Sequence, residues 1–136
     1  VGLADPMAMI QAVTAIESIK NLGLPEGMLS LSQAIVYVCE APKSNRVCIA
    51  MEKAAEKAKS VYNDDVPAHL KNSVYASDKD KELSAGYKYP HSYGGYVKQQ
   101  YLPDSLNGEV FYEPTENGFE KEIKEFRAFK KEKFGV

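Results

Sequence analysis

Residues 31–39 restrict the fold more than any other part of the chain, since seven of these nine residues are apolar. A helix that is apolar on all sides must be enclosed by other structure. Ser30 and Gln33 have the spacing of a capping box, and Pro42 follows closely, so the stretch is predicted to be a helix rather than a buried strand. We expect it to be either the central helix of a domain or part of a contact between subunits, with Tyr37 as a candidate contact residue.

Two amphipathic segments flank this stretch. Asp5-Pro6 is a favourable helix start, because the aspartate accepts hydrogen bonds from unpaired N–H groups and the proline has no N–H to leave unpaired. Apolar residues then recur every three or four positions over residues 9–22. Ser44 is placed to cap a third helix, whose apolar stripe runs over residues 47–58. The chain is therefore expected to begin with three helices.

Beyond the third helix, the pattern becomes less regular. Pro67 is expected to begin one short helical turn. Residues 86–115 are rich in glycine, proline and tyrosine and hold no lasting periodicity, which predicts an irregular segment. Residues 99–102 and 110–112 are expected to pair as a small hairpin around a turn at Asn107-Gly108.

Helical periodicity returns near the C-terminus. Asn117 and Glu120 have the spacing of a capping box, and Glu120 is expected to pair with Lys124 one turn later. Cations gather over residues 127–133, where they complement the helix dipole. Together these patterns predict an all-α helical bundle in a single domain over residues 1–136, with a helical core over about 5–85, an irregular segment over about 86–115 and a last helix over about 116–133.

The charge balance argues against a strong field around the chain, which has 17 basic and 19 acidic residues and a net charge of −2. Nucleic-acid binding by counterion release is therefore not its obvious role. No apolar run approaches the roughly 20 residues of a membrane helix, so we expect a cytoplasmic protein with no membrane contact. Cys39 and Cys48 are too few for a disulfide framework and are expected to be reduced core residues.

No set of residues with catalytic spacing can be identified. Nucleotide hydrolysis needs a glycine-rich turn before Lys and Ser or Thr, and this sequence has none. Its two histidines, His69 and His91, have no histidine or cysteine partner at metal-ligand spacing, which favours a structural or surface role for each. We expect no enzymatic activity, no cofactor and no metal site in this chain.

The irregular segment holds a cluster of tyrosines that is the main candidate for contact with a partner. Aromatic rings beside cations can stack on single-stranded bases. A segment with little regular backbone bonding also needs aromatic rings to anchor it, and we favour this second interpretation because the segment holds few cations. The candidate contact residues are Tyr37, Tyr87, Tyr89, His91, Tyr93, Tyr96 and Tyr101.

Seven short motifs follow one another in a fixed order. They are Leu24-Pro25-Glu26-Gly27, Ala41-Pro42-Lys43-Ser44-Asn45, Val66-Pro67-Ala68-His69-Leu70, Gly86-Tyr87-Lys88-Tyr89-Pro90-His91, Gln99-Gln100-Tyr101-Leu102-Pro103-Asp104, Tyr112-Glu113-Pro114-Thr115 and Asn117-Gly118-Phe119-Glu120. Each motif is weak alone, but their shared order over nearly the whole chain is specific. On these residues the chain resembles the C-terminal domain of RarA/MgsA-type AAA+ ATPases, a family related to the Werner helicase-interacting protein.

The resemblance implies a helical domain similar to the C-terminal oligomerisation domain of clamp-loader subunits, assembled as a homotetramer and joined to an upstream AAA+ motor. It also implies a parent that is a DNA-dependent ATPase, with ATP and Mg²⁺ in that motor, and that acts with DNA and replication-fork proteins in replication, recombination and repair at stalled forks, associated with the nucleoid through DNA. We therefore expect a homo-oligomerisation domain. The alternative is a module that binds DNA or a replication partner through residues 87–101 and the basic last helix.

Overall fold

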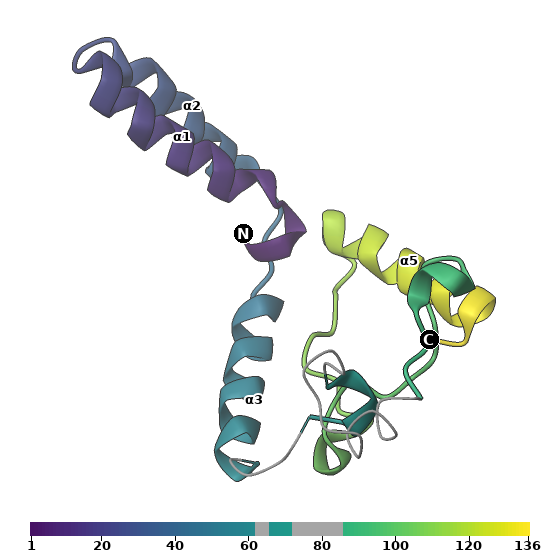
Figure 1. Cartoon of the computed structure of the whole chain (residues 1–136). Helices are drawn as coiled ribbons and strands as arrows, with labels where there is room; N and C mark the ends of the chain where they lie inside the picture. Colours follow the sequence, from purple (N-terminus) through teal and green to yellow (C-terminus); the bar gives the residue numbers. More distant parts are fainter. Residues whose placement is uncertain (62–65, 72–85) are drawn as a thin grey trace. The chain divides into compact units, whose positions relative to one another are not determined.

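A computed structural model describes residues 1–61, 66–71 and 86–136. Over these residues the chain forms α-helices and short 3-10 turns without any β-strand, which confirms the predicted all-α class (Figure 1). The α-helices are α1 (Met7–Leu22), α2 (Gly27–Glu40), α3 (Arg46–Ser60) and α5 (Phe119–Phe134). The 3-10 turns are η1 (Gly2–Ala4), η2 (Ala68–Leu70), η4 (Pro90–Tyr93) and η5 (Asp104–Leu106).

The chain divides into two compact units, and two of the three points at which it passes from one unit to the other fall inside helices, in α3 and in α5. The first unit contains Val1–Met51 and Tyr112–Glu125, and the second contains Glu52–Phe111 and Phe126–Val136. The single domain expected from the sequence stays a prediction, as does the similarity to clamp-loader subunits. Part of the expected helical core, residues 62–65 and 72–85, lies outside the described residues.

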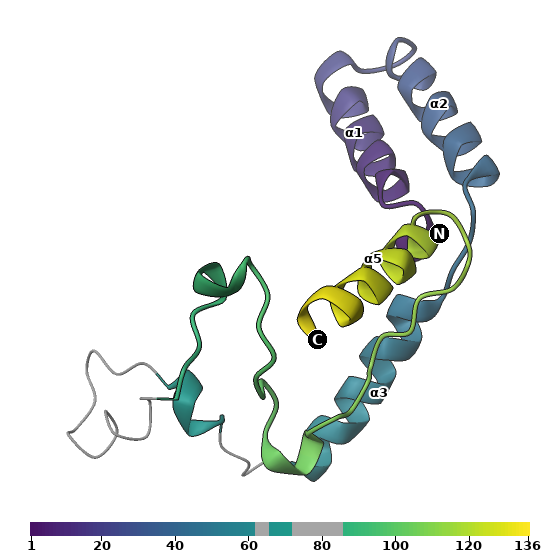
Figure 2. The ribbon, with the colours of Figure 1, turned by 90° about the vertical axis from the view of Figure 1, so that its right-hand side faces the viewer.

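The first unit is built around a pair of helices, α1 and α2, that lie side by side in both views (Figure 1; Figure 2). The residues that this pair buries are small: Ala8 and Ala15 on α1, and Gly27 and Ala34 on α2. A Cβ atom at Gly27 would lie 2.9 Å from the Ile19 Cα, so the two helices approach too closely there for any larger residue.

Polar side chains fix the pairing of these two helices. The Ser18 and Ser30 hydroxyls lie 2.7 Å apart, and the Gln33 amide donates to Gln11 across 3.4 Å. The predicted capping box at Ser30 and Gln33 is therefore wrong, because both side chains reach across to α1. Helix α2 begins three residues earlier than that prediction, at Gly27.

The starts of α1 and α3 agree with the sequence. The Asp5 Oδ1 atom accepts a hydrogen bond of 2.9 Å from the backbone N–H of Met7, next to Pro6. The Ser44 hydroxyl accepts one of 3.2 Å from the backbone N–H of Arg46. Each interaction satisfies an N–H group that has no partner inside its helix, as predicted.

A fully buried carboxylate, that of Glu120, joins the starts of α3 and α5 within the first unit. Its Oε1 atom accepts a hydrogen bond of 2.8 Å from the Ser44 hydroxyl. Its Oε2 atom accepts bonds of 2.8 Å from the Thr115 N–H and 2.7 Å from the Thr115 hydroxyl. Burial alone raises the pKa of this carboxyl, but these hydrogen bonds outweigh it and hold the pKa below its ordinary value.

Two predictions about the last helix are wrong for the same reason. Glu120 does not cap through Asn117, whose side-chain amide instead donates to the Lys43 carbonyl across 3.0 Å. Glu120 also does not pair with Lys124, which pairs with Glu116 at the surface. Tertiary packing has taken the Glu120 side chain inward, where it satisfies donors from another part of the chain.

The predicted hairpin is also absent from the described residues. The Gln99 side chain donates to the Lys88 carbonyl across 3.0 Å and accepts from the Lys88 N–H across 3.1 Å. The Gln99 side chain thus forms the two hydrogen bonds with the Lys88 backbone that a paired strand would otherwise form. Between the two expected strands, residues Asp104–Leu106 form η5, and Leu106 is buried there.

Candidate assembly interface

Among the described residues, small apolar side chains are buried and large ones are exposed, which is the reverse of the usual arrangement in a folded domain. Five of the six buried hydrophobic residues are alanines, and the sixth is Leu106. Large apolar side chains from α1, α2 and α3 are instead exposed. Burying a large apolar side chain stabilises a protein by about 1.5–3 kcal/mol, and a contiguous exposed apolar patch marks an interaction site. The first unit therefore carries a candidate assembly interface.

Helix α1 contributes one continuous exposed stripe to this surface. Met9, Val13 and Ile16 are spaced by four and three residues, so they lie along one side of the helix. Their exposed fractions are 74%, 55% and 52%. The buried alanines, Ala8 and Ala15, lie on a different side and face α2. We call the side chains of Met9, Val13 and Ile16 the α1 stripe.

Helix α2 is exposed in a similar way, which corrects one of its two predicted roles. Leu29 is 80% exposed and Val36, seven residues later on the same side, is 62% exposed. Within the described residues α2 packs on α1 and is not a central helix enclosed by the chain. Cys39 on α2 and Cys48 on α3 are exposed rather than in the core, because the helix sides that carry them are left uncovered.

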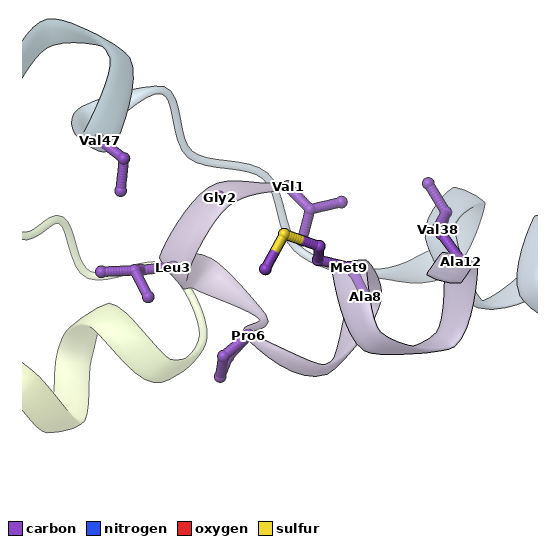
Figure 3. Close-up of a pocket in the computed structure, with 9 residues that line it drawn as sticks. All are labelled: Val1, Gly2, Leu3, Pro6, Ala8, Met9, Ala12, Val38 and Val47. Atoms are coloured by element: carbon purple, nitrogen blue, oxygen red, sulfur yellow. The ribbon is translucent and has the colours of Figure 1, made fainter. Parts of the chain in front are cut away.

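An apolar pocket of about 550 Å³ lies at one end of this helix pair. Figure 3 shows that its lining comes from η1, the first turns of α1, the end of α2 and the start of α3, with Val1, Met9 and Val38 among the side chains. Its lining residues are all apolar or glycine. The pocket therefore extends the apolar character of the α1 stripe to the N-terminal end of the helix.

Tyr37, the candidate contact residue on α2, is half-buried rather than fully available. Its hydroxyl donates a hydrogen bond of 2.9 Å to the Asp5 Oδ2 atom. The pKa of Tyr37 is raised, mainly by this hydrogen bond and to a smaller extent by burial and by the negative charge of Asp5. The Asp5 carboxylate thus both caps α1 and holds α2, which gives Tyr37 a structural role within the unit.

The remaining candidates belong to the second unit, and the structure separates them into two groups. Tyr96 packs on the last helix, with ring centroids 6.0 Å from Phe126 and 5.4 Å from Phe134, as the anchoring interpretation predicted. Tyr89 contacts the His91 ring at 5.0 Å, and both are exposed. The other four candidate tyrosines of this unit are about half exposed, with exposed fractions of 46% for Tyr87, 57% for Tyr89, 51% for Tyr93 and 53% for Tyr101.

The two histidines have different surroundings. A ring nitrogen of His69 lies 2.8 Å from the Gln100 carbonyl oxygen, which places this half-buried side chain in a structural contact. His91 lies at the surface beside Tyr89. Among the described residues, no three histidine, cysteine, aspartate or glutamate side chains gather where a metal ion would bind. Within the same residues, every helix is too short or too polar to cross a bilayer.

Comparison with known proteins identifies the family of this chain. Residues 1–130 match the family described as MgsA AAA+ ATPase C terminal. The chain belongs to this family. It is 37% identical over 127 residues to Replication-associated recombination protein A of Bacillus subtilis, an alignment that covers 92% of this chain and 30% of that protein. It is 32% identical over 115 residues to ATPase WRNIP1 of Dictyostelium discoideum, covering 83% of this chain and 13% of that protein.

A third relative, an uncharacterised protein of Thermotoga maritima, is 43% identical over 136 residues and is matched over 99% of this chain and 22% of its own length. This chain therefore spans a third or less of each of these three relatives. The family confirms the resemblance that the sequence motifs indicated. The candidate assembly interface rests on the exposed apolar residues of the first unit.

Proposed function

We propose that this chain is the homo-oligomerisation domain of a AAA+ ATPase and that it joins four copies through the apolar surface of α1 and α2. The supporting observation is the inverted packing of the first unit, in which alanines are buried between the helices while the α1 stripe and Leu29 face outward. A second copy of the same surface supplies the apolar partner that these side chains lack within the described residues.

The energy of this surface suits an assembly domain. The three side chains of the α1 stripe, if fully buried, would each contribute about 1.5–3 kcal/mol. An interface formed by identical copies buries that surface on both partners, which multiplies the gain. Association must exceed a cost of at least several kcal/mol in lost translational and rotational freedom. A few such side chains on each copy are sufficient in principle to exceed it.

The proposal extends to the parent protein through the relatives. Several of them are named replication-associated recombination proteins, and one is named an ATPase. We infer that the parent is a cytoplasmic ATPase that binds ATP and Mg²⁺ in an AAA+ domain outside this chain and acts with DNA and replication-fork proteins. This domain would then hold several motors together.

Light scattering coupled to size exclusion tests the assembly directly. At tens of micromolar the chain should elute with the mass of four copies. The variant Val13→Glu places a charge in the α1 stripe and should shift the mass toward one copy. Thr14→Glu is the matched control, because Thr14 is exposed on the same helix but lies outside the stripe. Circular dichroism should show the same helical content in both variants.

Two results would overturn the proposal. One is a chain that remains a single copy at tens of micromolar, since the exposed apolar surface would then be covered by something other than a sister copy. The other is an equal loss of mass in Val13→Glu and Thr14→Glu, since the assembly would then not depend on the α1 stripe.

A further inference from the structure

Two segments of the second unit concentrate positive charge in a chain that is acidic as a whole. Residues 86–101 and 126–136 together contain six basic side chains and one acidic side chain, a net charge of +5, whereas the whole chain carries −2. The sequence alone keeps these cations more than 20 residues apart. The structure brings the two segments together through the contacts of Tyr96 with Phe126 and Phe134.

A groove of about 460 Å³ lies where the two segments meet. Lys98 and Lys130 line it from opposite segments. Tyr96, Gln99 and Tyr101 add polar and aromatic atoms, and Val97 and Val136 add apolar ones. Its lining contains no acidic side chain. Lys130 is positioned by the aromatic rings beneath it, since its Nζ atom lies 5.0 Å from the Tyr96 ring centroid and 5.3 Å from that of Phe126.

The aromatic side chains around this groove are held in place while part of each ring stays open. The Gln99 amide donates to the Tyr101 hydroxyl across 3.0 Å and also fixes the Lys88 backbone. Tyr87 and Tyr89, on either side of Lys88, are therefore held alongside the segment that carries Tyr101. All three tyrosines keep about half of their surface exposed.

We propose that this groove, between residues 95–101 and the end of α5, binds single-stranded nucleic acid. Lysines on both sides attract the phosphates, while the exposed tyrosine rings offer flat faces to unpaired bases. A duplex keeps its bases stacked inside and has no free base face for the tyrosines. An acidic peptide satisfies the charge but does not use the rings as stacking surfaces.

Fluorescence anisotropy with a labelled oligothymidylate of 20 nucleotides tests this proposal on the whole chain. The chain should bind the oligonucleotide more tightly at low salt than at high salt. In Lys98→Gln, the slope of log affinity against log salt concentration should become smaller by about 0.7, the value for one phosphate contact on a single strand. Lys59→Gln is the matched control, because it removes the same charge at an exposed position on α3, outside the groove lining.

A second pair of variants tests the stacking. Tyr101→Ala should weaken binding about five-fold or more, as expected for the loss of one stacked base, whereas Tyr101→Phe should keep most of the affinity. Circular dichroism spectra should match the parent chain in each case. The Phe variant keeps the ring and loses only the hydroxyl that accepts from Gln99.

Several outcomes would overturn the proposal. They are no binding of the oligonucleotide at low salt, equal losses in Lys98→Gln and Lys59→Gln, equal affinity for a duplex of the same length, and displacement of the oligonucleotide by polyglutamate at an equal concentration of charge. The last result would assign the groove to an acidic protein partner. None of these outcomes bears on the light-scattering test of the α1 stripe.

Discussion

The buried carboxylate of Glu120 allows a quantitative prediction. A hydrogen bond to a charged acceptor contributes about 1.5–3 kcal/mol, against about 0.5–1.5 kcal/mol for a neutral one. In Glu120→Gln the amide oxygen can keep both bonds from Thr115, and the amide nitrogen can donate to the Ser44 hydroxyl. The variant therefore loses the charge and also the acceptor of the Ser44 hydroxyl hydrogen. After allowing for the smaller cost of burying a neutral group, we expect the free energy of unfolding to fall by about 1–2 kcal/mol.

Glu120→Ala removes the acceptor altogether. The Thr115 N–H and the hydroxyls of Thr115 and Ser44 then lose their partner in a buried place, and a cavity remains. We expect a fall of about 3–5 kcal/mol in the free energy of unfolding. Urea denaturation followed by circular dichroism measures both variants, and the Gln variant should shift the midpoint by about 1 M or less.

Glu125→Gln serves as the control for this series, because Glu125 is exposed on the same helix. It should change the free energy of unfolding by no more than about 0.5 kcal/mol. If Glu120→Gln were as stable as Glu125→Gln, the buried hydrogen bonds would not contribute as argued. A larger loss of stability in Glu120→Gln than in Glu120→Ala would also contradict the prediction, since it would show that the amide group does not fit the site of the carboxylate.

The pH dependence of stability provides an independent check on Glu120. Its pKa in the folded state lies below the ordinary value of 4.5, so the ionised form is favoured by folding. The stabilisation is complete above the unfolded pKa and is lost as the pH falls through the folded pKa. The difference in stability between the parent chain and Glu120→Gln should therefore shrink below pH 4.5. A difference that stays constant between pH 7 and pH 3 would refute the assignment.

Other predictions concern backbone approach and surface charge. Gly118→Ala should lower the free energy of unfolding by about 2 kcal/mol or more, because φ is +52° and the new Cβ would collide with the Ala4 carbonyl oxygen. Gly108→Ala, at φ +88° but in open space, should cost only about 1 kcal/mol, and equal costs would contradict this. Gly27→Ala should destabilise the helix pair despite the higher helix propensity of alanine, and a gain in melting temperature would refute the close approach. Lys57→Gln, which removes the exposed ion pair with Glu109, should leave the midpoint of urea denaturation nearly unchanged, and a clear fall in the midpoint would mean that the pair is not simply a surface contact.

The helix starts show where local reasoning succeeds. Asp5 and Ser44 satisfy N–H groups two residues away, so the interaction depends only on the neighbouring chain. The spacing of Glu120 from Asn117 is equally suitable for a cap, but the Glu120 side chain accepts a hydrogen bond from Ser44, which is distant in the sequence. A pattern cannot distinguish these two cases, because the competing donor from Ser44 arrives only when the chain has folded.

Burial was harder to predict than helix formation. The apolar pattern of residues 31–39 was correctly interpreted as a helix, but the pattern does not say which molecule covers it. Ile35 and Val36 are 54% and 62% exposed, so the enclosure that the composition requires is missing within the described residues. The same limit explains why Cys39 was expected in the core.

The amino-acid order by itself determined that the chain is helical, where most helices begin, and to which family it belongs, because periodicity, capping and motif order are local properties. Only the tertiary structure decided that alanines are buried while the α1 stripe is exposed, that Glu120 turns inward, and that the cations of residues 86–101 and 126–136 meet at one groove. These properties depend on distances between segments far apart in the sequence, which are set by packing and not by any short pattern.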